Sequence, residues 1–316
     1  MRLIVAITVL IFLLTDLLAA PLDTDAYPAP GLRIWIGRHH LHIYCIGDGA
    51  PTVVLDAGLG GTSLDWAKVQ PEVAKFTRVC SYDRAGYGWS DEGPKPRTAD
   101  VIAAELERLL GYSEITGPYI LVGHSFGALG VRLFASRFPQ KIAGLVLIDA
   151  THEAQFERFE AAQIPTLAPA NNRRFVIANH YQIPEGLPAA IKPIAQALAL
   201  GPSAIDALYD ELRNMRISAH QVGLLNKLPN VPLLVLAHDG RALARSDRAK
   251  RMAGIWLDLQ QDLASRTPQG QFVVTADSGH YIHLDQPNIV IEAIRKVVEI
   301  SRIVPCGEQP QQLLSC

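Results

Sequence analysis

This chain of 316 residues has few cysteines, no excess of charge of one sign and, after its first residues, no long apolar run. Its four cysteines lack the paired spacing and nearby histidines of a zinc site, so the sequence predicts no metal centre. A formal net charge of −2 gives no reason to expect a nucleic-acid partner. There is no internal repeat and no Asn-x-Ser/Thr glycosylation site. The composition, 49% apolar and 19% charged, is that of a globular protein with a full core.

The one long apolar run lies at the start of the chain. Arg2 precedes Leu3–Leu14, which only Thr8 interrupts. A basic start and a run of this length are typical of a signal peptide and short for a membrane span. Leu18 stands three residues before the expected cleavage point, where a small residue is usual, so residues 1–20 are expected to be a signal peptide or an uncleaved anchor. We therefore expect an exported protein, periplasmic or secreted, whose only membrane contact is this segment.

A strand-like run and a helical pattern flank the sequence Gly-His-Ser-Phe-Gly at residues 123–127. This context is typical of a nucleophile elbow, in which a serine sits on a sharp turn between a strand and a helix. Ser125 is therefore the predicted nucleophile. Because inert α/β proteins also contain glycine-rich turns, the prediction depends on the rest of the chain.

Strand-like runs alternate with helical patterns along most of the chain. Such alternation predicts a mostly parallel sheet with helices on both faces. Residues 151–230 interrupt it, because they are rich in helical patterns and proline and contain no clear strand. We interpret this segment as a helical insertion that divides an α/β core of residues 31–150 and 231–304. The strand-like runs are 32–36, 41–46, 52–55, 76–82, 119–122, 142–148, 231–237 and 271–275.

Four residues of catalytic type follow predicted strand ends, namely Ser125, Asp149, Asp239 and His280. Active sites of parallel sheets lie beyond the carboxyl ends of the strands, so these residues are expected to meet. A serine needs a base, and histidine is the natural base at neutral pH. His280 is the candidate base. His124 is interpreted as structural or as lining the pocket, because neighbouring side chains on a tight turn diverge.

The base in turn needs a carboxylate, and two aspartates are candidates. Asp149 ends the strand after the nucleophile strand, and Asp239 ends the following strand. Both keep the order serine, aspartate, histidine along the chain. For the oxyanion hole we expect the backbone N–H of Phe126 and that of Leu59, which lies in a glycine-rich loop.

Together these motifs resemble those of the α/β-hydrolase superfamily, and the resemblance extends from Leu32 to Ser301. It implies the α/β-hydrolase fold, with an eight-stranded, mostly parallel sheet, helices on both faces and a helical cap at residues 151–230. It also implies Ser125 as nucleophile, His280 as base and no cofactor. The matching motifs are Ala57-Gly58-Leu59-Gly60, Asp83-Arg84-x-Gly86-x-Gly88-x-Ser90, Gly123-His124-Ser125-Phe126-Gly127 and Ser278-Gly279-His280.

The chain departs from the superfamily pattern at two positions. Ala57 replaces the histidine that usually begins the oxyanion loop, so this loop must be braced differently. The acid of the superfamily usually follows the strand that here ends near Ala237, in a register that falls on Arg241. A minority of members takes the acid from the strand directly after the nucleophile strand. That placement favours Asp149, with Asp239 as the alternative.

The resemblance also carries an implication for the cysteines. The strand order of the superfamily places the strand of Cys45 beside that of Cys80, which implies a contact and, in an exported protein, a disulfide bond. The remaining pair, Cys306 and Cys316, lies in the C-terminal tail.

The function expected from the resemblance is hydrolysis of an ester or related acyl bond in a small apolar substrate, through an acyl-enzyme. A serine at the elbow argues against epoxide hydrolase or dehalogenase chemistry, which in this superfamily uses an aspartate there. Carbon–carbon bond hydrolases, lactonases, peptidases and perhydrolases use the same three catalytic residues and remain alternatives. So does a non-catalytic, ligand-binding member of the fold. The sequence predicts no oligomeric state.

Overall fold

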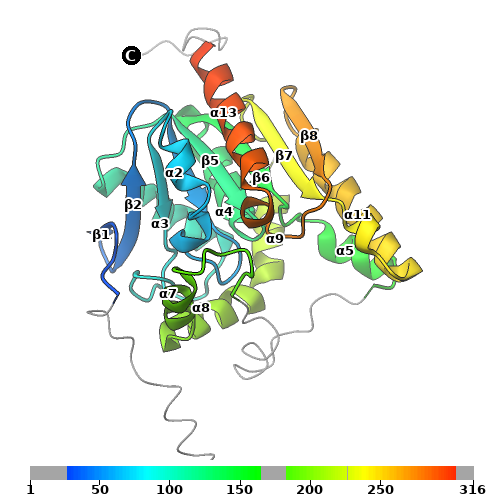
Figure 1. Ribbon diagram of the computed structural model, residues 1–316, viewed down its shortest axis with the longest axis horizontal. Helices are drawn as coiled ribbons and strands as arrows, with labels where there is room; N and C mark the ends of the chain where they lie inside the picture. Colours follow the sequence, from blue (N-terminus) through cyan, green and yellow to red (C-terminus); the bar gives the residue numbers. More distant parts are fainter. Residues whose placement is uncertain (1–26, 165–182, 226, 304–316) are drawn as a thin grey trace, which may run out of the picture.

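A sheet of eight strands forms the centre of the structure, a computed structural model that describes residues 27–164, 183–225 and 227–303 (Figure 1). The strand order is β1-β2-β4-β3-β5-β6-β7-β8. The pairs β1–β2 and β2–β4 are antiparallel, and every other neighbouring pair is parallel. The prediction of an eight-stranded, mostly parallel sheet is confirmed. The strands are β1 (Leu32–Trp35), β2 (His40–Ile46), β3 (Thr52–Asp56), β4 (Val79–Tyr82), β5 (Tyr119–His124), β6 (Ile142–Ile148), β7 (Leu233–His238) and β8 (Gly270–Thr275).

Helices cover both faces of this sheet, which explains why its central strands β3, β4 and β5 are buried along their whole length and mostly apolar. Successive side chains of a strand point to opposite faces. In β5, Leu121 therefore packs in a cluster with residues of α3 (Ala99–Tyr112), α4 (Gly127–Arg137) and α11 (Asp247–Ala264). Its neighbours Ile120 and Val122 pack in a second cluster, with residues of α2 (Gln70–Val73) and α13 (Pro287–Ile303), which lie on the near face in Figure 1. A run of alternating apolar and polar residues could not satisfy both faces.

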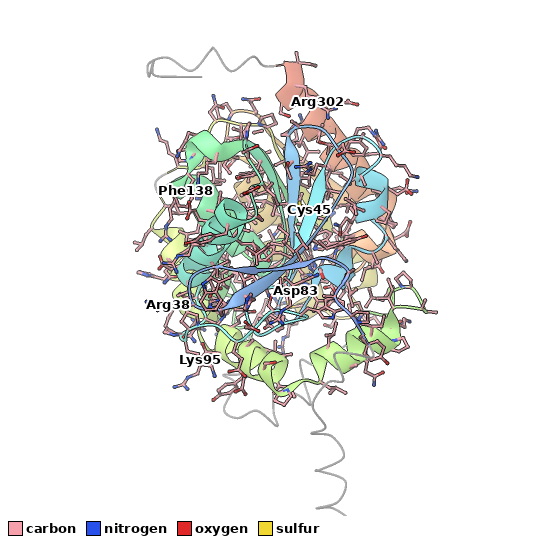
Figure 2. All side chains as sticks on the ribbon, turned by 90° about the vertical axis from the view of Figure 1, so that its left-hand side faces the viewer. Arg38, Cys45, Asp83, Lys95, Phe138 and Arg302 are labelled. Carbon is pink, nitrogen blue, oxygen red and sulfur yellow. A yellow bond between two sulfur atoms is a disulfide. The ribbon has the colours of Figure 1, made fainter. Side chains whose placement is uncertain are left out.

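The described parts of the segment between β6 and β7 consist of helices joined by turns and loops. No strand occurs in its described parts. In the side view of Figure 2, Lys95 marks the end of the molecule where these helices gather, and its Nζ lies 3.6 Å from Asp206 of α8. Arg302 of α13 marks the opposite end. The helices of this segment are α5 (Gln155–Ala161), α7 (Lys192–Ala199), α8 (Pro202–Arg213) and α9 (Met215–Gly223).

Short helices complete the described chain. They are η1 (Ser63–Trp66), η2 (Pro139–Lys141), α10 (Gly240–Leu243) and α12 (Ile282–Asp285). Within the part of the chain that the structure describes, no helix is both long enough and apolar enough to cross a membrane. The predicted signal peptide or anchor at residues 1–20 lies outside the described residues, as do Cys306 and Cys316.

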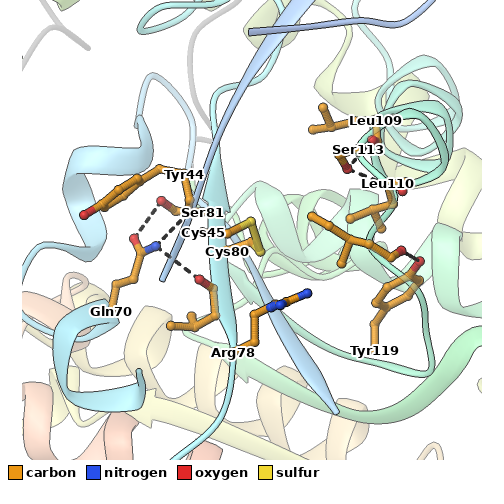
Figure 3. The surroundings of a disulfide bond; sticks show 12 residues. Tyr44, Cys45, Gln70, Arg78, Cys80, Ser81, Leu109, Leu110, Ser113 and Tyr119 are labelled. Carbon is orange, nitrogen blue, oxygen red and sulfur yellow. Dashed lines mark hydrogen bonds between the residues drawn. A yellow bond between two sulfur atoms is a disulfide. The ribbon is translucent and has the colours of Figure 1, made fainter. Parts of the chain in front are cut away.

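A disulfide bond joins Cys45 of β2 to Cys80 of β4 (Figure 3). The two residues are direct partners in the antiparallel register of these strands. The pairing that the resemblance implied is therefore confirmed. Gln70 reinforces the same strand pair, because its side chain donates to the Tyr44 carbonyl at 2.8 Å and accepts from the Ser81 hydroxyl at 2.7 Å.

Removing this disulfide is expected to lower the free energy of unfolding. The bond joins residues 35 apart, and a crosslink of that span stabilises a protein by about 2–4 kcal/mol, chiefly by restricting the unfolded chain. We expect a loss of this size when Cys45 and Cys80 are both replaced by serine, measured by urea unfolding. A reductant should shift the unfolding curve of the unaltered protein and leave that of the double variant where it is. An unaltered protein that does not respond to reduction would contradict the prediction.

Candidate active site

Ser125 occupies a sharp turn between β5 and α4. Its backbone φ is 48°, in the left-handed region that residues with a side chain rarely adopt. The turn also needs close backbone approach on both sides of the serine. A Cβ atom at Gly127 would lie 2.5 Å from the Ala57 carbonyl oxygen, and one at Gly123 would lie 2.7 Å from the Cα atom of Ala128. The two glycines and the strained serine together form the elbow geometry predicted from the sequence.

The structure brings Ser125, His280 and Asp149 into one chain of hydrogen bonds, although 155 and 131 residues separate His280 from the other two. The Ser125 Oγ lies 2.9 Å from His280 Nε2, and His280 Nδ1 lies 2.5 Å from Asp149 Oδ2. A carboxylate can only accept, so His280 must carry its proton on Nδ1. Its Nε2 is then the acceptor for the serine hydroxyl, which is the arrangement a general base requires.

The carboxylate of Asp149 is fully buried at the end of β6. Its position is fixed by the sheet, because its backbone N–H donates to the carbonyl of Leu236 in β7 at 2.7 Å. Burial by itself would raise the pKa of Asp149, but hydrogen bonds from His238 and His280 outweigh it and lower this pKa to about 2. The carboxylate is therefore ionised at neutral pH.

Asp239, the alternative acid, lies apart from this chain of hydrogen bonds. Its carboxylate accepts from the guanidinium of Arg241, with distances of 2.8 Å to Nε and 2.9 Å to Nη2. It also accepts from the Arg241 backbone N–H and so caps α10. The hydrogen bond from Arg241 lowers the pKa of Asp239 to about 2. Of the two candidate aspartates, the structure brings only Asp149 to His280.

Two further residues at this site were not predicted from the sequence. His238 Nδ1 lies 2.7 Å from Asp149 Oδ2, and Trp256 Nε1 donates to Asp149 Oδ1 at 2.7 Å. His238 carried a weak signal, because it is a polar residue at the end of an apolar strand-like run. Trp256 carried none. It lies in the middle of α11, and only the packing of that helix beside β7 directs its indole toward the carboxylate.

Asp149, His238 and His280 are also residues of metal-binding type, and their potential ligand atoms lie within 4.8 Å of one another. Both imidazoles, however, use Nδ1 to donate to the same carboxylate oxygen. An ion bound through these Nδ1 atoms would have to displace both protons. Hydrogen bonding fully accounts for the arrangement, and we derive no metal-dependent step from it.

The two backbone N–H groups expected to form an oxyanion hole flank the serine. Phe126 follows Ser125 at the N-terminal end of α4, and Leu59 lies in the loop after β3 and lines the same cavity as Ser125. Among the described residues, neither N–H donates to a backbone carbonyl. Both donors are therefore free to bind an oxygen atom placed near Ser125.

Arg84 braces the oxyanion loop, which lacks the histidine usual at position 57. Its guanidinium donates to the carbonyl of Ala57 at 2.6 Å and to that of Gly58 at 2.8 Å. Its Nη1 lies 2.8 Å from Asp56, and its Nε lies 2.9 Å from Glu211 of α8. A buried arginine thus links the loop, the end of β3 and the inserted helices through charged hydrogen bonds, which are stronger than neutral ones.

His124 contacts the base loop rather than the serine hydroxyl. Its Nε2 lies 3.0 Å from the backbone carbonyl of His280, so this nitrogen must be the donor. Burial, together with the nearby His283 and His280, lowers the pKa of His124 far below its usual value. The ring is therefore neutral at physiological pH. It ties the elbow to the loop that carries His280.

Ser125 and His280 line a cavity of about 610 Å³ that the inserted helices help to enclose. Most of its wall is apolar, and no lysine or arginine lines it among the described residues. One carboxyl group is present in the wall, that of Asp65, whose pKa burial raises to about 7. The described part of the wall therefore suits a largely uncharged, apolar ligand. Apolar residues of its wall include Leu59, Phe156, Leu187, Leu208, Met252 and Trp256.

The chain is similar in sequence and in fold to known proteins. The model of a family described as "Alpha/beta hydrolase family" matches residues 53–293. The uncharacterized protein YqjL of Bacillus subtilis is 28% identical over 254 residues, which cover 79% of this chain and 85% of the relative. A thermophilic esterase from Thermogutta terrifontis has a similar structure, with a TM-score of 0.60 and 24% identity over 85% of this chain and 98% of the esterase.

A second similar structure shows how broad the likeness is. The epoxide hydrolase VrEH1 from Vigna radiata has a TM-score of 0.66 but only 14% identity, over 85% of this chain and 97% of its own. At such identities the structural likeness concerns the fold alone. The family match, in contrast, covers most of the sequence, including the elbow and the loop of His280. The chain therefore belongs to the alpha/beta hydrolase family.

Proposed function

We propose that this protein is a serine hydrolase that cleaves an ester or related acyl bond through an acyl-enzyme. The observation that carries the proposal is the unbroken hydrogen-bond chain from Ser125 Oγ through His280 to Asp149. His280 Nε2 takes the hydroxyl proton as Oγ attacks the substrate carbonyl carbon. The ionised Asp149 stabilises the imidazolium that forms and holds the tautomer that leaves Nε2 free.

The tetrahedral intermediate places a negative charge on the former carbonyl oxygen. The N–H groups of Leu59 and Phe126 would bind this oxygen, because both lie beside Ser125 and lack a backbone acceptor among the described residues. Collapse of the intermediate expels the alcohol, which takes the proton from His280. A water molecule then gives a proton to His280 and attacks the acyl-enzyme. Collapse of the second intermediate returns that proton to Ser125 and releases the carboxylic acid.

The cavity favours a small substrate with an apolar acyl or alcohol group. Its wall is mostly apolar and, among the described residues, contains no lysine or arginine, which favours an uncharged substrate over a carboxylate or phosphate. The serine at the elbow favours acyl transfer over epoxide opening, because the superfamily uses an aspartate nucleophile for the latter. The esterase from Thermogutta terrifontis, whose fold is similar, makes ester hydrolysis the first activity to assay.

We also propose that the protein is exported. Two observations support this: the signal-peptide pattern of residues 1–20 and the disulfide between Cys45 and Cys80. Disulfides persist in oxidising compartments such as the periplasm and the extracellular space. N-terminal sequencing of the protein from membrane, periplasmic and culture fractions would distinguish a cleaved signal peptide from a retained anchor.

Labelling with a fluorophosphonate tests the proposed mechanism directly. Such a probe reacts with a serine only when a base activates it, so the folded protein should form one adduct, on Ser125. Tryptic digestion places this residue in the peptide 109–132, which also contains Ser113 as an internal control. Heat-unfolded protein should not react. A folded protein that fails to label at Ser125 would favour the non-catalytic, ligand-binding alternative.

A further inference from the structure

The buried carboxylate of Asp149 accepts from more groups than the base alone. Besides the bond from His280, its oxygens accept three hydrogen bonds. Trp256 Nε1 donates at 2.7 Å, and His238 donates through its ring Nδ1 at 2.7 Å and its backbone N–H at 3.3 Å. A fully buried carboxylate needs such donors to stay ionised. His238 is unusual among them, because it is the only one besides His280 that can change its charge near neutral pH.

The two histidines share one oxygen atom. His238 Nδ1 and His280 Nδ1 both point to Asp149 Oδ2, at 2.7 and 2.5 Å. Because the backbone N–H of His238 donates to Oδ1, this single residue at the end of β7 holds both oxygens of the carboxylate. The orientation of Asp149, and with it the direction in which Oδ2 faces His280, therefore depends on His238.

His238 can also carry a charge at this position. A carboxylate only accepts, so Nδ1 of His238 is protonated and its Nε2 is the titrating nitrogen. The side chain is 24% exposed, and solvent can supply the proton. The hydrogen bond to Asp149 raises the pKa of His238, burial opposes this rise, and the charges of Asp149 and Asp239 add to it.

The surroundings of His238 contain few other charges. Asp149 faces it from the end of β6, His280 from the loop after β8, and Asp239 and Arg241 from the adjoining turn, where they pair with each other. Its neighbour in β8 is the uncharged Thr275, and α11 contributes the uncharged Trp256 to the same carboxylate. Protonation of His238 therefore acts chiefly on the pair formed by Asp149 and His280.

We propose that His238 is a positioning residue of the triad. When neutral it supports proton transfer from Ser125 to His280, and its own protonation opposes that transfer. When neutral, it orients Asp149 Oδ2 toward His280. When protonated on Nε2, it places a second positive charge on the carboxylate that must stabilise the His280 imidazolium. The two ring centroids are 6.5 Å apart, so this charge opposes proton transfer from Ser125 to His280 and slows acylation. The proposal rests on the serine-hydrolase function proposed above.

The pH dependence of kcat/KM for a p-nitrophenyl ester tests the proposal. In the unaltered protein the activity should fall in two steps as the pH is lowered, one of which comes from protonation of His238. His238→Asn keeps an N–H donor near the position of Nδ1 but cannot titrate, so its activity should fall in one step. Two steps in this variant would overturn the proposal.

Two more variants distinguish a role of His238 in positioning Asp149 from a role in folding. His238→Leu removes the ring donor and should lower kcat about 10-fold at pH 8 with little change in KM, because a hydrogen bond to a buried charge is lost. Trp256→Phe is the matched control: it also removes one donor to Asp149 but should retain two steps. Thermal melting identifies a variant that is merely unfolded. A folded His238→Leu protein with unchanged kcat would overturn the positioning role.

A titration that does not depend on activity distinguishes failure of this inference from failure of the proposed function. NMR of ¹³C-labelled histidine should show that Asp149→Asn lowers the pKa of His238, because the carboxylate that stabilises the charged ring is lost. An unchanged pKa would overturn the inference even if Ser125 labels with fluorophosphonate. If Ser125 does not label while the pKa does fall, the interaction stands and the proposed function fails.

Discussion

Replacing Ser125 with alanine is expected to lower kcat for ester hydrolysis by about 10⁶-fold, and the remaining rate would come from substrate binding and the oxyanion hole. A serine nucleophile and its base act as one unit, and removal of the nucleophile in a comparable triad has an effect of this size. The substitution leaves no other residue within the hydrogen-bond chain that could form the acyl-enzyme. Initial rates with p-nitrophenyl esters of different acyl length would measure the loss.

The control for this experiment is Ser113→Ala. Ser113 follows α3 and its hydroxyl donates to the Leu109 carbonyl, away from the cavity. This variant should hydrolyse the ester at the rate of the unaltered protein. If Ser125→Ala is folded by thermal melting and keeps more than about one thousandth of the activity, attack by Ser125 is not the route of the reaction.

Exchange of Asp149 for asparagine is expected to lower kcat by about 10⁴-fold. The asparagine amide would present an N–H group to His280 and favour the tautomer with its proton on Nε2, which cannot accept from Ser125. Asp239→Asn should change kcat by no more than about threefold, because Asp239 bonds to Arg241 and not to His280. Steady-state kinetics of the two variants on the same ester would compare them directly.

The pair of variants is informative because both replace a strand-end aspartate with its isosteric amide. Each aspartate has a carboxyl whose pKa is lowered to about 2, so ionisation alone does not separate them. Their hydrogen-bond partners differ. The hydrogen bonds that lower the pKa of Asp149 come from two histidines, and the hydrogen bond that lowers the pKa of Asp239 comes from an exposed arginine. A severe loss in Asp239→Asn with an active Asp149→Asn would reverse the assignment of the acid.

Local sequence was informative wherever the chemistry lies in a short segment. The elbow could be predicted because a strand, a tight turn and a helix follow one another within residues 119–137, and glycine is the residue that permits their close approach. The sheet could be predicted because strands covered on both faces are mostly apolar. His280 could be proposed because a loop at the carboxyl end of a parallel strand reaches the same edge as the elbow.

The carboxylate could not be chosen from local sequence. Asp149 and Asp239 both end apolar strands, and both lie in the correct chain order. Their difference is where the side chain points after the strand ends. Asp149 has a φ of 43° and its carboxylate lies 2.5 Å from His280 Nδ1, whereas Asp239 caps the first turn of α10 and bonds to Arg241. The resemblance favoured Asp149, but the local pattern of residues did not separate the two.

The sequence by itself indicated the sheet, the elbow and the candidate nucleophile and base, since apolar strands, the Gly-x-Ser-x-Gly turn and strand-end positions can all be read along the chain. Only the tertiary structure decided which aspartate meets His280, because strands β6, β7 and β8 must first pair before their ends become neighbours. The same holds for His238 and Trp256. Their contacts with Asp149 join segments 89 and 107 residues apart, and no local pattern encodes the packing of a helix beside a strand end.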